Sequence, residues 1–179
     1  VVAPLNGSFD KDSLLQMVQT AQGDSVVEKS FVFNHLSRSL SSVTAEEKRV
    51  LLLNAKYADY ENGKIEGVTM VTPNQRAKNG MLHVSESPIP YERNLYEMLC
   101  DKDELAPIGA LLRSYEEDYF DADRSISSGV VEGVPVYVDS VIIERNKMLD
   151  ALGYINREDS LYLVAAPTKD KWNSLWEET

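Results

Sequence analysis

The stretch that decides the fold is Asn79-Gly80-Met81-Leu82-His83-Val84, which Pro90 closes six residues later. An Asn-Gly pair favours a tight turn, and the apolar residues after it are typical of a half-buried strand. We expect Gly80 to supply a backbone shape that side chains forbid. A second pair, Asn62-Gly63, precedes an alternating run over residues 64–71 and predicts a β-hairpin. A loop with Pro73 is expected over residues 72–78.

The same short element occurs at both ends of the chain. Val1-Val2-Ala3-Pro4 is followed by Phe9, and Val164-Ala165-Ala166-Pro167 is followed by Trp172, each residue 163 positions after its counterpart. Each copy predicts a buried strand that ends at the proline and leads into a helix, so residues 160–166 are a predicted strand. A repeat of this length is the size of a domain and indicates a tandem organisation.

The pattern changes near residues 91–94, where we place a domain boundary. Asn94 is a predicted N-cap for a helix over residues 94–100, and a second helix is expected over 105–115. The acidic stretch 116–124 is a predicted loop. Residues 130–138 predict a hairpin with Gly133 in its turn, and Pro135 marks an edge strand. A helix over 146–152 follows, so the fold class is α+β.

The composition of the chain argues against some classes of partner and site. The chain of 179 residues has a net charge of −11, which argues against nucleic-acid partners because phosphates repel it. Hydrophobic residues make up 43% of the chain, enough for a substantial core. Cys100 is the only cysteine, so an intrachain disulfide or a multi-cysteine metal site is excluded.

These motifs together resemble fasciclin-like domains. Val1-Val2-Ala3-Pro4 with Phe9 resembles the first signature segment of that family, and residues 79–84 with Pro90 resemble the second. Phe33-Asn34-His35-Leu36 is similar to the strand start that carries an aromatic-His pair in the family. Residues 94–99 resemble the opening helix of a following domain, and residues 160–172 resemble its first signature segment.

The resemblance implies an α+β fold, a fasciclin-like β-wedge or sandwich flanked by helices. Residues 1–93 would be one domain without its opening helices. Residues 94–179 would be the opening portion of a second, with an insertion around 116–158. The structural signature residues would be Ala3, Pro4, Phe9, His35, Asn79, Gly80, His83, Pro90, Ala166, Pro167 and Trp172. Residues 94–179 could also complete the first part, within one chain or as an exchange dimer.

The family consists of extracellular adhesion and matrix modules without catalysis or cofactors. Bacterial members are secreted or surface-anchored, so we expect an extracellular or cell-surface protein, such as a lipoprotein, anchored by a segment outside this chain. Its partners would be a protein or glycan at a cell surface and neighbouring fasciclin-like domains. Asn34 stands where animal members carry the tyrosine of an integrin-binding Tyr-His pair, so integrin binding is not inferred.

Three other interpretations of the residues stay open. A carbohydrate- or small-ligand-binding module could use Tyr57, Tyr60, Tyr91 or the acidic stretch. A hydrolase built on His35 or His83 is the least expected, because the chain lacks a Gly-x-Ser-x-Gly elbow. Each histidine is more simply a structural imidazole, hydrogen-bonded to backbone. The acidic run 116–123 could suggest calcium, but it lacks the glycine and terminal glutamate of an EF-hand loop.

Modification of serines is a further prediction. The tripeptide Asp-Ser-aliphatic occurs four times, and some bacteria O-glycosylate this type of site on surface proteins. Helix capping or a strand edge would explain the same serines. The four candidates are Ser13, Ser25, Ser140 and Ser160.

Overall fold

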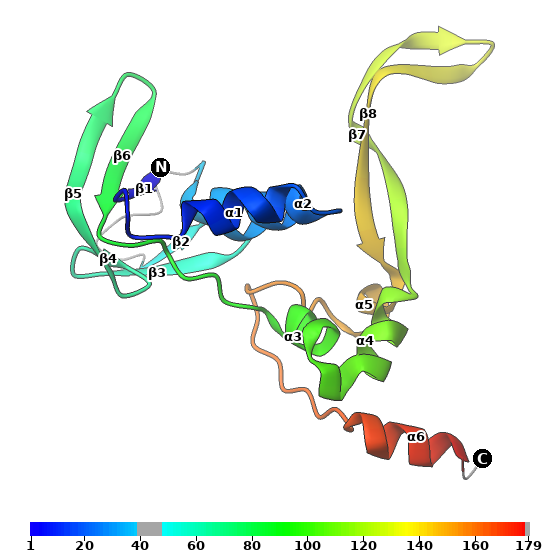
Figure 1. Ribbon diagram of the computed structural model, residues 1–179. Coiled ribbons are helices and arrows are strands. Elements are labelled where there is room, and N and C mark those ends of the chain that lie inside the picture. The colour runs from blue at the N-terminus through cyan, green and yellow to red at the C-terminus, as the bar shows by residue number, and fades with distance from the viewer. Residues whose placement is uncertain (39–47, 178–179) are drawn as a thin grey trace. The chain divides into compact units, whose positions relative to one another are not determined.

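The computed structural model describes residues 1–38 and 48–177, and it divides into two compact units. The first unit comprises residues 1–92 together with 157–159, and the second comprises 93–156 and 160–179. Helices and strands occur in both units, so the fold is α+β, as the sequence predicts (Figure 1). Whether the two units are fasciclin-like domains stays a prediction.

The first unit is built on a six-stranded sheet. Its strand order is β1-β6-β5-β4-β3-β2; β1 runs parallel to β6, and the other neighbours are antiparallel. The strands are β1 Val2–Pro4, β2 Arg49–Leu51, β3 Tyr57–Glu61, β4 Lys64–Ile65, β5 Val68–Ala77 and β6 Gly80–Ser85. The segments that resemble the first and the second signature of the family lie side by side in this sheet, because β1 pairs with β6.

Tight turns set the path of this sheet. Asn62 and Gly63 have φ of 52° and 77°, a pair of left-handed residues typical of a type I′ turn, so the predicted hairpin is confirmed. A second such turn at Glu66-Gly67 divides the predicted strand 64–71 into β4 and β5. The predicted loop at 72–78 is wrong. β5 continues through Pro73, which lies where the register shifts and no ladder bond is lost.

The core of the first unit joins β1 to the rest of the sheet. Its buried members are Val2, Val50, Leu52, Ala58, Ile65, Val68, Met70 and Ile89. The helical segments are α1 Lys11–Val18, α2 Gly23–Val27, the π-helical turn Glu28–Val32 and the 3-10 turn Phe33–His35. The strand start that the family resemblance implies at residues 33–36 is therefore wrong, because these residues close a helical run.

Short capped helices and a hairpin form the second unit. Its helices are α3 Leu95–Asp101, the 3-10 turn Asp103–Leu105, α4 Ala106–Arg113, α5 Lys147–Leu152 and α6 Lys169–Glu177. Asn94 and Glu97 form a reciprocal capping box at α3, and the Asn146 side chain caps α5. The core consists of Leu99, Cys100 and Leu112, with Ile108, Ile155 and Ala166 against it. The three helices predicted over 94–152 are confirmed.

A long hairpin leaves this helical core. β7 covers Glu116–Val131 and β8 covers Val134–Asn146, so the hairpin is far longer than the predicted 130–138. Gly133 lies in its turn, as predicted. The predicted acidic loop at 116–124 is wrong, because residues 116–121 pair in register with residues 141–146 of β8. Strand formation here depends on that partner, which lies outside the local sequence window.

The predicted strand at 160–166 is also wrong. These residues are neither helix nor strand, and the side chains of Leu161 and Leu163 are completely exposed. Ala166 alone reaches the core of the unit. The sequence pattern of a buried strand is present, but no strand of the described residues lies beside it.

Candidate functional site

The predicted signature residue His35 is buried and bonded at both ring nitrogens. Nδ1 lies 2.6 Å from the carbonyl oxygen of Phe31, and the backbone N–H of Ile89 donates to Nε2 at 2.9 Å. These partners fix a neutral ring with its proton on Nδ1, and burial lowers the pKa of His35. The His35 ring therefore binds the backbone at Ile89, and neither of its nitrogens is available to a ligand or a substrate.

Phe9, the signature aromatic, is linked to His35 by a third ring. The centroids of Phe9 and Phe31 are 5.1 Å apart, and those of Phe31 and His35 are 4.9 Å apart. Tilted aromatic pairs at such distances add to the stability gained from burial. The structure therefore brings two predicted residues together as one packing cluster.

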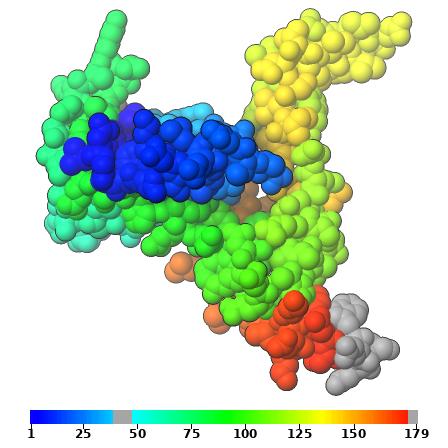
Figure 2. Space-filling model, viewed as in Figure 1, coloured from blue at the N-terminus to red at the C-terminus, as the bar shows by residue number. Residues whose placement is uncertain are grey.

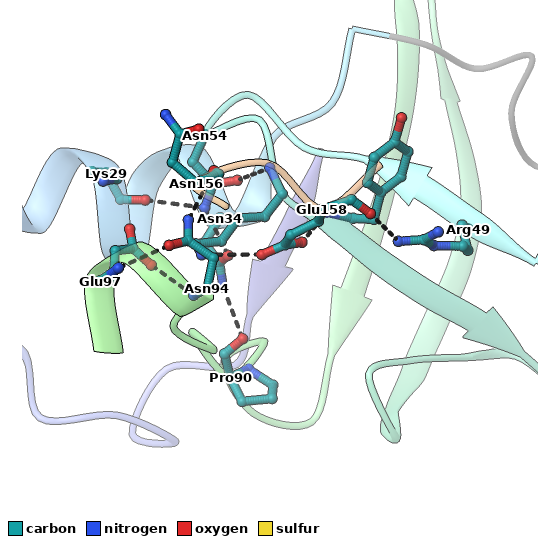
Figure 3. Close-up of polar contacts among 11 residues, drawn as sticks. Lys29, Asn34, Arg49, Asn54, Pro90, Asn94, Glu97, Asn156 and Glu158 are labelled. Carbon is teal, nitrogen blue, oxygen red and sulfur yellow. Dashed lines mark hydrogen bonds and ion pairs between the residues drawn. The ribbon is translucent and has the colours of Figure 1, made fainter. Parts of the chain in front are cut away.

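Asn34 is 2% exposed and forms the centre of a polar network (Figure 3). Its Nδ2 donates to the carbonyl oxygens of Ile89 at 3.0 Å and Pro90 at 3.2 Å. Asn54 donates to the Asn34 side-chain oxygen at 2.9 Å. Asn34 and His35 together hold residues 89–90, so neither offers a surface for a partner, and Pro90 contributes a carbonyl acceptor.

A buried ion pair joins residues 157–159 to the rest of the first unit. Lys56 Nζ lies 3.1 Å from Glu158 Oε1, and the Lys56 side chain is 6% exposed. The N–H of Tyr57 donates to the other Glu158 oxygen at 2.8 Å, and Arg49 donates to its backbone carbonyl at 3.1 Å (Figure 3). Sequence analysis missed this pair because 102 positions separate its members and neither lies in a recognisable motif.

His83 lines a cavity of about 170 Å³ in the first unit, together with His35 and Tyr60. Its Nδ1 accepts from the N–H of Asn74 at 3.3 Å, and burial is the main cause of its lowered pKa. The remaining walls are mainly aliphatic, with Val50, Leu52 and Ile65 among them. Typical ligand pockets hold about 300–1,000 Å³, so this space is small for a sugar ring with its hydroxyl groups.

The tyrosines of the glycan-binding alternative do not share this cavity. Only Tyr60 lines it. The Arg49 guanidinium lies over the ring of Tyr57 at 4.3 Å, and the Lys56 ammonium lies over Tyr91 at 4.8 Å. Each of these rings already has a cationic partner, which leaves the glycan alternative without a tyrosine platform in the described residues.

The expected steric role of Gly80 is wrong. Gly80 is not among the glycines with positive φ, and a Cβ built on it would meet nothing within 4 Å. Asn79 is exposed in the two-residue connection before β6, where its side chain meets the solvent. The Asn-Gly pair therefore marks the turn but is not required there by close packing.

The second copy of the repeated element is only partly packed. Ala166 contacts the core of the second unit, Pro167 is half-buried, and Trp172 is half-buried in α6, with its N–H donating to Thr168 at 2.9 Å. In the first copy, Ala3 and Pro4 pair with Val84 and Ser85 of β6.

All four candidate serines are exposed. Ser13 and Ser25 lie in α1 and α2, where their N–H groups bond to aspartate side chains, and Ser140 lies opposite an irregularity of β7. In both helices an aspartate is the acceptor, so the capping explanation does not account for the serine hydroxyls. Glycosylation stays a prediction.

The distal half of the β7–β8 hairpin, residues 125–138, carries a run of exposed apolar side chains. We call it the arm (Figure 2). Five aliphatic side chains on it are more than half exposed: Ile126, Val130, Val131, Val134 and Val138. Glu132 at the tip is its only charged residue. The base of the hairpin, in contrast, carries ion pairs such as Lys147–Glu117 and Arg145–Asp150.

Within residues 1–38 and 48–177, no group of three or more His, Cys, Asp or Glu side chains is placed to hold a metal ion. No helix in that part of the chain is both long and apolar enough to cross a membrane. Comparisons with protein-family models, with curated proteins and with solved structures find no match.

Proposed function

We propose that this chain is a non-enzymatic adhesion or structural module that works at a cell surface or in the extracellular space, and that the arm is its contact element. The observation that carries the proposal is the exposure of the arm. Val130 is 66% exposed and Val138 is 71% exposed, on a segment with one charged residue. An exposed apolar segment of this kind supports a binding role, since large exposed apolar surfaces on soluble proteins mark interaction sites.

The energetics of a two-stranded ribbon support this function. A single hairpin is marginally stable in water, and it needs a further strand or a packed layer to become stable. Each Å² of apolar surface that a partner covers contributes about 25 cal/mol. The arm therefore gains stability and burial from a partner, while the charged base of the hairpin keeps the free protein soluble.

The two histidines give no support to a hydrolase. Both ring nitrogens of His35 bond to backbone groups, and His83 accepts a backbone N–H in a mainly aliphatic cavity. A catalytic base needs a nitrogen within hydrogen-bond reach of the proton it removes. These contacts fit structural roles better.

The setting of the proposal rests on the fasciclin-like resemblance. It would place the chain outside the cell, secreted or held by an anchor such as a lipid, among further fasciclin-like domains. A protein or a glycan on a surface would be the partner. The small volume of the cavity and the separate tyrosines give the small-ligand alternative less support than the arm gives to adhesion.

A matched pair of proteins tests the proposed function. In the variant, residues 122–140 are replaced by Asn-Gly, which joins the cross-strand partners Asp121 and Val141. Beads coated with each protein are measured for clustering and for binding to panels of matrix proteins and glycans. We expect binding by the full chain and its loss in the variant, with equal far-UV circular dichroism from the helices. Equal binding by both proteins would overturn the proposal.

A further inference from the structure

The cavity that His83 lines in the first unit combines a buried wall with an exposed mouth. The buried part of its lining is aliphatic and comprises Val2, Val50, Leu52 and Ile65. Asn74, in contrast, is an exposed member of the lining. A small molecule can therefore enter from solvent and lose its contact with water against the aliphatic wall.

The volume of this cavity matches a molecule with a single six-membered ring. The cavity holds about 170 Å³, and an apolar cavity of about 150 Å³ is large enough for benzene. Side chains around an empty apolar space lack the dispersion contacts of a packed core, so an apolar molecule that fills the space gains those contacts. A ring with one small substituent is the size of ligand that the cavity accommodates.

The lining also determines the charge of such a ligand. Among the described residues, no Asp, Glu, Lys or Arg side chain lines the cavity. The Val1 amino group lies at the exposed end, where it donates to the Met81 carbonyl oxygen at 3.0 Å. A charged group at the buried aliphatic wall would lose its water without gaining an opposite charge, which is costly. The lining therefore favours a neutral molecule.

His83 provides one directed polar contact in this lining. Its Nδ1 accepts from the backbone N–H of Asn74, so the proton of the neutral ring lies on Nε2. No group of the described residues bonds to that Nε2, whereas both nitrogens of His35 are bonded to backbone. His83 therefore keeps one donor for an acceptor atom on a molecule in the cavity.

We infer that this cavity binds a small neutral molecule that has a single apolar ring and one hydrogen-bond acceptor, with phenol as the simplest probe. The ring lies against the aliphatic wall, and the acceptor receives the Nε2 proton of His83. A sugar does not fit this description, because its hydroxyl groups surround the ring. The cavity belongs to the first unit and the arm to the second, so the inference goes beyond the proposed function and does not depend on it.

Methyl NMR of the full chain, titrated with phenol and with toluene, tests the inference. We expect the methyl signals of Val50, Leu52 and Ile65 to shift with either probe. Met81→Trp places a larger side chain in the lining, and it should raise the dissociation constant for phenol by about tenfold or more. Leu82→Trp is the matched control, because the adjacent residue of β6 points to the opposite face of the strand and should leave binding unchanged.

A second variant tests the polar contact at His83. Phenol and toluene are similar in size and differ in a hydroxyl group against a methyl group. In His83→Phe the affinity for phenol relative to toluene should fall by about threefold to tenfold, which is the effect of one hydrogen bond. A purely structural role of His83 predicts instead that both probes weaken equally, and that result would contradict the assigned contact.

The outcomes separate this inference from the proposed function. If the methyl signals do not move with phenol or toluene up to the solubility of each probe, the cavity holds water only and the inference is wrong. Equal weakening in Met81→Trp and Leu82→Trp would also overturn it, and binding of benzoate as tight as that of phenol would overturn the neutral class. The variant in which Asn-Gly replaces residues 122–140 should bind phenol as the full chain does, so a failure of the adhesion proposal is seen independently.

Discussion

The two copies of the repeated element have similar sequences and different structures. Val2–Pro4 forms β1, pairs with β6 and places Val2 in the core. Residues 164–167, with the same Val-x-Ala-Pro pattern, form no strand, and Leu163 just before them is completely exposed. The difference lies in the neighbour. β6 covers the first copy, and no described strand covers the second.

The comparison shows that strand formation in this chain depends on a partner and not only on local pattern. In the first unit, β1 pairs with β6 and Glu158 pairs with the buried Lys56 ammonium. The second unit leaves extended backbone uncovered, both before Pro167 and along the outer edge of β7. Binding capacity is therefore expected in the second unit.

The largest expected effect on stability comes from breaking the buried Lys56–Glu158 ion pair of the first unit. Glu158→Gln leaves the Lys56 ammonium buried without its counterion, and we expect a loss of about 3 kcal/mol in the stability of that unit. Hydrogen exchange of the sheet amides measures this loss, while the fluorescence of the two tryptophans, both in α6, reports on the second unit. Adding Lys56→Met should restore most of the stability. Equal destabilisation of both units would contradict the account.

The next largest effect on stability is expected from adding a methyl group at Gly109, and almost none from adding one at Gly80. Gly109 lies where α4 approaches α3, and an added Cβ would come 2.8 Å from the Cα of Cys100 and 2.9 Å from the Leu99 carbonyl oxygen. Gly109→Ala should destabilise the second unit by about 2 kcal/mol through overpacking. Gly80→Ala should change the first unit by less than about 0.5 kcal/mol, since its Cβ meets nothing. Thermal denaturation of both variants gives the comparison, which a larger effect at Gly80 would contradict.

A third pair compares the two copies of the element directly. Val2→Ala removes the equivalent of two methylene groups from the core, and it should cost about 1.5 kcal/mol. Leu163→Ala removes a larger side chain that is already in water, and its cost should stay within about 0.5 kcal/mol. Urea denaturation measures both values. A cost at Leu163 as large as that at Val2 would mean that the second copy is packed in solution.

The smallest effect is a pH dependence in the first unit. Burial lowers the pKa of His35 from 6.5, so the unfolded chain binds its proton at a higher pH than the folded chain does. The contribution is complete above pH 6.5 and is lost as pH falls through the lowered folded value. We expect the first unit to lose stability as the pH falls below 6.5. In His35→Gln this slope should be smaller, with His83 supplying the remainder; an unchanged slope would contradict the assignment.

Local patterns predicted most of the elements correctly. The turns at Gly63 and Gly133, the capping box at Asn94 and the helix before Gly153 follow from the backbone preferences and capping bonds of a few adjacent residues. The predicted strands at residues 1–4 and 81–84 are also present, as β1 and β6.

The failures have one physical cause, which is dependence on distant residues. Residues 116–121 form a strand only because residues 141–146 lie opposite. The Lys56–Glu158 pair joins positions 102 apart. Residues 160–166 have the pattern of a strand but lack the neighbour that would complete it. Sequence pattern records which residues favour a strand, whereas pairing depends on the rest of the fold.

The most direct test of the account is amide hydrogen exchange of the full chain. Leu5, whose N–H donates to Ser85 at 3.0 Å, should be protected. The amide of Thr168, its counterpart in the second copy, should exchange rapidly. Protection of Thr168 equal to that of Leu5 would contradict the distinction between a paired first copy and an unpaired second copy of the repeated element.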